Sequence, residues 1–88
     1  TDEPLANLVQ GARWLAGQGV ELIAVPCNNS HFWHRRMQAA CPVPILHIGE
    51  VVAQALRRLA PSASPVAVLS TRATLRAGVY GNALRAHG

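Results

Sequence analysis

The residue with the clearest chemical potential in this chain is Cys27, which is followed directly by small polar side chains. A short apolar run precedes it, so the thiol is predicted to lie at the carboxyl end of a buried strand and at the start of a helix. Ligands bind at that edge of open α/β sheets, and backbone N–H groups there favour carboxylates. The same field lowers the pKa of a cysteine and raises its thiolate fraction. We interpret Cys27 as a thiol that acts on a carboxylate-bearing substrate, against the alternative of a buried, inert cysteine.

A second group of polar side chains follows another apolar run at residues 66–69. The hydroxyls of Thr71 and Thr74 flank the predicted start of the last helix, where they can donate hydrogen bonds to an anion. The simpler alternative, which the position alone favours, is that they only cap the helix.

The elements that must position these residues alternate along the chain. Apolar residues recur at helical spacing over residues 5–16, 51–59 and about 73–86, and a further helix is predicted between residues 28–30 and Pro42. Continuous apolar runs at 22–25, 45–48 and 66–69 are typical of strands buried on both faces. This order predicts an α/β fold with a parallel sheet and right-handed crossovers. Three strands are few for such a sheet, so we expect the fold to be present only in part.

The only change of composition that resembles a linker is the proline- and serine-rich segment 61–65. We therefore predict a partial first α/β domain over residues 1–60, which carries Cys27, and the opening strand and helix of a second domain over residues 66–88. The chain has no initiator Met, and both ends read as cuts. We expect the chain alone to be inactive and at best marginally folded.

Composition excludes several classes of function. All eight basic residues are Arg, they are spread along the chain, and the net charge is +4, which argues against nucleic-acid binding. The absence of Lys means that these residues cannot hold pyridoxal phosphate through a Schiff base. Two cysteines, no secretory segment and no apolar run of about 18 residues indicate a reduced, cytoplasmic protein without membrane contact.

Three segments in register resemble the Asp/Glu racemase superfamily, and its aspartate racemase branch in particular. Residues 26–31 resemble the family's P-C-N-T-A-H motif, residues 44–48 its I-P-hydrophobic-H-I strand, and residues 68–80 its L-L-[AS]-T-x-x-T…S-x-x-Y segment. Asn29 stands where the family usually has Thr, and Ser30 stands where it has Ala. The run can also be aligned one residue later, which leaves the roles of Asn28 and Asn29 interchangeable.

The resemblance implies two pseudo-symmetric, Rossmann-like α/β domains with the active site between them. It also implies cofactor-independent racemisation of an acidic amino acid, with aspartate as the first candidate, by one thiolate that removes the Cα proton and one thiol that returns a proton. On this basis Cys27 is one acid/base group, and the α-carboxylate is held by Asn28, Asn29, Thr71 and Thr74. The second catalytic cysteine is expected outside this chain, and the full-length protein is a possible homodimer.

Other residues and other functions remain to be weighed. Cys41 matches no motif position, so we interpret it as structural, and a zinc site is not expected because no second pair of ligands accompanies Cys27 and His31. A thiol-nucleophile hydrolase or transferase would need His31 as its base. A non-catalytic carboxylate-binding fragment is the third alternative.

Overall fold

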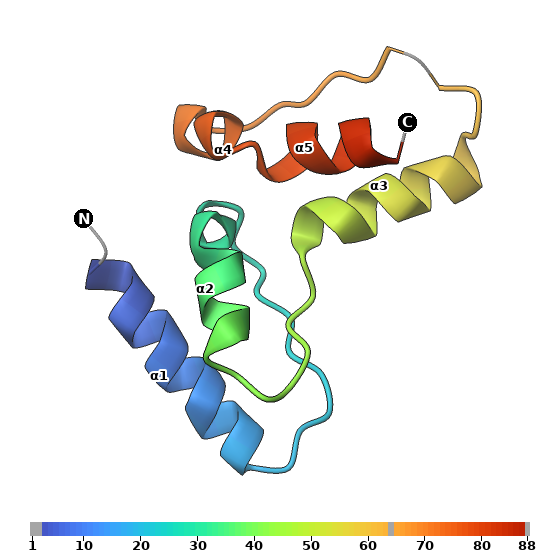
Figure 1. Cartoon of the computed structure of the whole chain (residues 1–88). Coiled ribbons are helices and arrows are strands. Elements are labelled where there is room, and N and C mark those ends of the chain that lie inside the picture. The colour runs from blue at the N-terminus through green and yellow to red at the C-terminus, as the bar shows by residue number, and fades with distance from the viewer. Residues whose placement is uncertain (1–2, 64, 88) are drawn as a thin grey trace.

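The structure is a computed structural model that describes residues 3–63 and 65–87. These residues form five α-helices and one 3-10 helix. Figure 1 shows the helices in two groups joined by irregular segments. The elements are α1 (Glu3–Gly17), η1 (Asn29–Trp33), α2 (His34–Ala39), α3 (Ile48–Leu59), α4 (Arg72–Ala77) and α5 (Val79–Ala86). Ser64, in the predicted linker, lies outside the described residues, and the division into two domains stays a prediction.

The predicted parallel-sheet fold is wrong for the part of the chain that the structure describes. The first two apolar runs meet only at one parallel bridge between Ile23 and Ile45, which lies in no strand. Two hydrogen bonds form it: Ile23 N–H donates to Pro44 O (3.0 Å), and Leu46 N–H donates to Ile23 O (2.9 Å). The third run, at residues 66–69, is exposed throughout and forms no strand.

Both runs at the bridge are shortened by local structure. The Cys27 N–H donates to Val25 O (2.8 Å), a two-residue bend that ends the first run at Pro26. The second run ends at His47, whose side chain accepts a hydrogen bond from Glu50 N–H and so caps α3. The chain turns into α3 at Ile48, so too few extended residues remain for a ladder.

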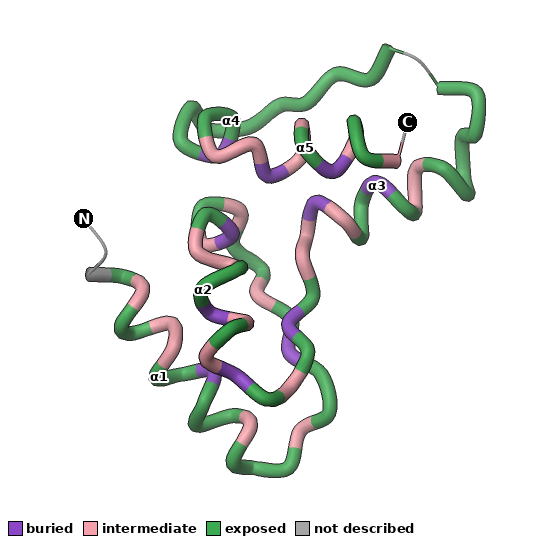
Figure 2. The backbone as a smooth tube through the Cα atoms, viewed as in Figure 1, coloured by how far each residue is buried: buried purple, intermediate pink, exposed green. Residues whose placement is uncertain are grey.

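The first core lies between α1, α2 and the bridge. Figure 2 shows its buried positions where α1 and α2 face each other and at the crossing of the two extended segments. The buried members are Ala12, Ile23, Met37, Cys41 and Ile45. The side chain of Gln38 closes the turn after α2, because it donates to Val43 O (3.0 Å) and accepts from Ile45 N–H (2.7 Å).

The second packed region lies between α3 and α5. Small side chains line the contact, and the four buried positions are Gly49, Ala53, Val79 and Ala83. The predicted single helix over about 73–86 is broken into α4 and α5 at Gly78, whose φ of 70° is left-handed. The break lets α4 contact η1 while α5 packs along α3.

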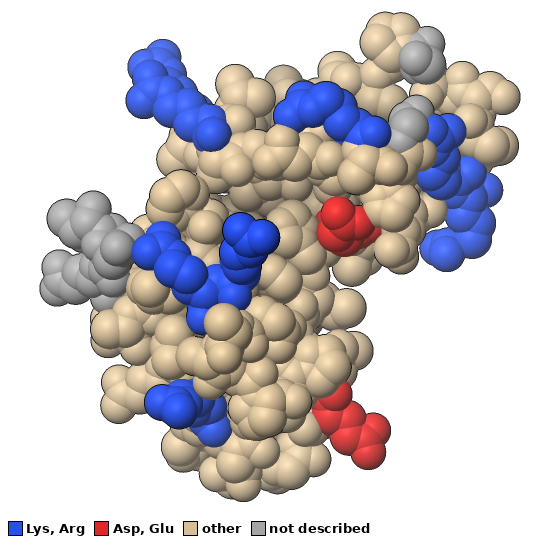
Figure 3. Space-filling view, in the orientation of Figure 1, with Lys and Arg blue, Asp and Glu red and all other residues tan. Residues whose placement is uncertain are grey.

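Two small cores give an open molecule. The radius of gyration is 14.1 Å, whereas a compact domain of this length is expected near 12 Å, by an order-of-magnitude scaling rule. Figure 3 shows arginines at separate places on one face, without a single basic patch. Among the described residues no helix is both long and apolar enough to cross a membrane.

Candidate active site

The Cys27 thiol is exposed at the bend that follows the bridge, two residues before η1. The pKa of this thiol lies below its usual value, chiefly because the Ser30 hydroxyl donates a hydrogen bond to the sulfur. The Ser30 N–H lowers the pKa further, burial acts weakly in the opposite direction, and the Asn29 N–H lowers it as well. Hydrogen bonds to sulfur favour the charged form, so the loop stabilises a thiolate.

Asn29 joins the thiol loop to the start of α4. Its side-chain oxygen accepts hydrogen bonds from the hydroxyls of Thr71 (2.9 Å) and Thr74 (2.5 Å). Thr71 also caps α4 by accepting from Thr74 N–H (3.2 Å), which is the role that the simpler alternative predicted. The structure therefore brings together three predicted site residues from segments more than 40 positions apart.

Asn28 makes a similar hydrogen-bonded contact with α5. The Tyr80 hydroxyl donates to its side-chain oxygen (2.7 Å). With both Asn oxygens engaged by hydroxyls, the amide nitrogens of Asn28 and Asn29 are oriented as donors. A carboxylate accepts hydrogen bonds only, so two such donors beside a thiol suit an amino-acid substrate. Tyr80 had no role assigned from sequence, although it is the only tyrosine in the chain.

Thr74 differs from its neighbours in burial. It is 1% exposed, and its hydroxyl lies between Asn29 and Thr71. Because a buried, hydrogen-bonded hydroxyl does not reach a ligand directly, Thr74 is suited to orienting Asn29 and Thr71, both of which are exposed. Cys41, by contrast, is buried in the first core, where its sulfur contacts Ala12 O at 3.9 Å.

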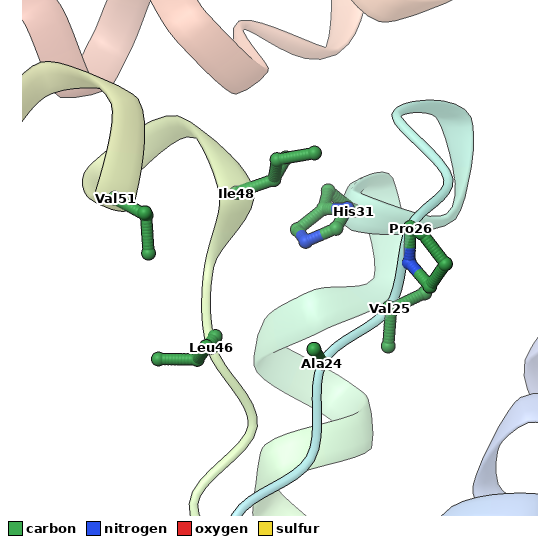
Figure 4. A pocket seen from close by; sticks show the side chains of 7 residues that line it. All are labelled: Ala24, Val25, Pro26, His31, Leu46, Ile48 and Val51. Carbon is green, nitrogen blue, oxygen red and sulfur yellow. The ribbon is translucent and has the colours of Figure 1, made fainter.

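An apolar cavity of about 240 Å³ lies beside residues 24–26, which directly precede Cys27. Figure 4 shows its lining side chains, which come from the two extended segments, η1 and the start of α3. The lining residues are Ala24, Val25, Pro26, His31, Leu46, Ile48 and Val51. His31 is the only polar side chain among them.

Three imidazoles gather beside this cavity, a feature that the sequence analysis missed. The ring of His31 stacks on His34 (6.0 Å between centroids) and meets His47 edge-on (5.2 Å). Burial lowers the pKa of His47, and the neighbouring charges of His34 and His31 lower it further. The spacing of His31 and His34, three apart at a helix start, could have indicated a shared face. No group of side chains in the described residues could hold a metal ion.

Comparison with known proteins identifies a family for this chain. The chain is 33% identical over 87 residues to the broad specificity amino-acid racemase RacX of Bacillus subtilis (strain 168). The match covers 99% of this chain and 37% of that relative, so the chain spans little more than a third of it. No solved structure matches the chain. The sequence profile of the Asp/Glu/Hydantoin racemase family matches residues 1–88, and the chain therefore belongs to that family.

Proposed function

We propose that the protein carrying this chain racemises an acidic amino acid, with aspartate as the first candidate, and that Cys27 is one of its two proton-transfer groups. The observation that carries the proposal is the exposed thiol with a lowered pKa, held within two residues of oriented amide donors. The proton α to a carboxylate is weakly acidic, so a racemase needs a base beside that carbon and donors for the developing charge.

The roles follow from the contacts. The Cys27 thiolate takes the Cα proton, which breaks the C–H bond and leaves the electron pair on the substrate. The amide N–H groups of Asn28 and Asn29 donate to the α-carboxylate. The hydroxyls of Thr71 and Thr74 orient Asn29, and the Tyr80 hydroxyl orients Asn28. A second thiol returns a proton to the opposite face. Cys41 does not fit this role, because it is buried in the first core, and the second thiol is therefore proposed to lie elsewhere in the protein.

The proposed mechanism uses no pyridoxal phosphate. The thiolate takes the proton directly, the electron pair is delocalised into the α-carboxylate, and the amide donors stabilise the charge that develops there. The sequence alternative of a thiol nucleophile with His31 as base is less well supported. The Nδ1 atom of His31 contacts the Cys27 carbonyl oxygen at 2.8 Å, and its Nε2 atom has no partner in the described residues. Neither ring nitrogen is engaged with the sulfur as a triad would require.

The test is exchange of the substrate Cα–H for deuterium, followed by NMR in D₂O, with the whole protein. Cys27→Ala should lower exchange into aspartate by on the order of 10²–10⁴-fold, whereas Cys41→Ala, the matched control, should retain it once folding is verified. Iodoacetamide should inactivate the protein and hydroxylamine, which attacks Schiff bases, should not. Undiminished exchange in Cys27→Ala would remove this thiol from the mechanism. Aspartate, glutamate and alanine compared under the same conditions decide the substrate class.

A further inference from the structure

His31 closes the loop that carries the thiol. It is 6% exposed, its backbone N–H donates to Asn28 O (3.1 Å), and its Nδ1 atom lies 2.8 Å from Cys27 O. A carbonyl oxygen only accepts, so Nδ1 carries the hydrogen in this contact. The side chain thus returns from the end of the loop to its first residue.

In the described part of the chain, the hydrogen-bonding groups that lower the pKa of the Cys27 thiol lie inside this closed loop. The donors are the hydroxyl and N–H of Ser30 and the N–H of Asn29. Their directions depend on the peptide plane between Cys27 and Asn28, which is the plane whose oxygen His31 holds. We propose that His31 is a positioning residue of the reaction, because its Nδ1–H bond to the Cys27 carbonyl keeps the donors of Asn29 and Ser30 directed at the thiol. This role deepens the proposed function and rests on it.

The surroundings of the ring support this assignment. His34 and His47 contact it from α2 and from the turn before α3, and His34 Nε2–H is itself fixed by Ile45 O (2.7 Å). Together they hold the imidazole in one orientation.

The Nε2 side of the His31 ring is energetically unfavourable. The unpaired Nε2 atom is buried beside an apolar cavity (Figure 4). An unsatisfied buried polar atom is unfavourable, and a leucine would fill such a site without that penalty. The contact that compensates for an imidazole here is the one made by Nδ1.

Two isosteric replacements separate the two nitrogens. His31→Asn puts an amide N–H near the position of Nδ1, and His31→Gln puts it near Nε2. The readout is the rate of Cys27 alkylation by iodoacetamide in the whole protein, followed from pH 7 to 10 and located by peptide mass spectrometry. The titratable groups that contact His31 are His34 and His47, and Glu50 lies next to His47, so every variant is compared with the natural protein at the same pH.

His31→Asn should alkylate as the natural chain does. His31→Gln and His31→Leu should react roughly three- to tenfold more slowly at pH 7, with the midpoint moved up by as much as about one pH unit. Cys41 reports folding in the same sample, because it stays unreactive while the first core is intact, and Phe32→Leu is the control at the exposed neighbouring position.

The proposal would be overturned if the natural protein and the three His31 variants were alkylated at equal rates while Cys41 stayed protected. An equal loss of rate in His31→Asn and His31→Gln would overturn it as well. In the whole protein, His31→Gln should lower kcat for aspartate and leave KM unchanged, and His31→Asn should restore kcat. The alkylation assay does not depend on racemisation. The expected thiol response in a protein that does not racemise amino acids therefore contradicts the proposed function and leaves the positioning contact supported.

Discussion

Replacement of Gly49 by Ala tests the contact between α3 and α5 most directly. Gly49 is buried in the first turn of α3, and a Cβ atom there would lie 2.0 Å from Val79 O and 3.0 Å from both Val79 C and His47 Cε1. Ordinary contacts begin at 3.4 Å. The nearest obstacle is the backbone of α5, which no side-chain rotation can move away, so the two helices must separate.

The magnitude follows from two opposing effects. Overpacking of a core that must shift costs about 1–3 kcal/mol, and the helix preference of Ala over Gly returns up to about 1 kcal/mol. Separation of the helices also loosens the packing around the buried Ala53 of α3 and Ala83 of α5, so we expect a net loss of about 2 kcal/mol. For a chain of this size the midpoint of thermal unfolding should fall by roughly 8–16 °C.

The assay is thermal unfolding followed by circular dichroism at 222 nm, with amide hydrogen exchange in α5. Gly11→Ala is the matched control, since Gly11 lies on the exposed side of α1 and a Cβ atom there meets nothing within 4 Å. It should stabilise the chain by about 0.4–1 kcal/mol. An unchanged midpoint for Gly49→Ala beside a raised one for Gly11→Ala would refute the close packing of α3 on α5.

Two further predictions concern the first core and the imidazole cluster. Gln38→Met should destabilise the chain by about 2–3 kcal/mol, because three backbone groups around residues 41–45 lose their hydrogen-bond partner. Urea unfolding measures the free energy of unfolding, with Gln54→Met at an exposed position as the control. Equal losses of stability in the two variants would contradict the prediction. The pKa of His47 is depressed on folding, so at acidic pH the unfolded chain binds more protons than the folded chain. The stability associated with the neutral His47 ring is therefore complete above the unfolded pKa of about 6.5. It is lost as the pH falls through the folded pKa. His47→Asn keeps a cap for Glu50 N–H and removes the titration, so its stability should fall less between pH 7.5 and 5.5 in the same urea assay; a slope as steep as that of the natural chain would assign the pH dependence to other groups.

Local patterns in the sequence predicted the helices better than the sheet. Residues 5–16 and 51–59 form α1 and α3 because their apolar stripes and end residues act within a few positions of one another. A strand needs a partner that is distant in sequence, and a short apolar run does not name one. Two local hydrogen bonds, at Val25 and at His47, then shortened the runs. The break at Gly78 was missed because a glycine inside a helical pattern is ambiguous until its φ is known.

The candidate site was predicted as a set of residues but not as an arrangement. Cys27, Asn28, Asn29, Thr71 and Thr74 were chosen from motifs in two segments, and the structure connects the segments through side-chain hydrogen bonds. That connection depends on how α4 and α5 pack, which no local pattern encodes. The contact of Tyr80 with Asn28 was missed for the same reason, since these residues lie far apart in the sequence. The contact of His31 with Cys27 spans only four positions and depends on the local turn of the loop, which residue types alone do not define.

The hydrogen bonds from Thr71 and Thr74 to Asn29 couple ligand binding at the proposed site to the docking of the two groups of helices. In the proposed site, the amide donors lie on one side of this contact and the hydroxyls that orient them lie on the other, so a carboxylate ligand would bind the docked form more tightly than the separated one. Mass action then favours docking by about 2.7 kcal/mol when the ligand is present at 100 times its dissociation constant. In so open a molecule, a bound substrate would therefore add directly to the stability of the docked fold.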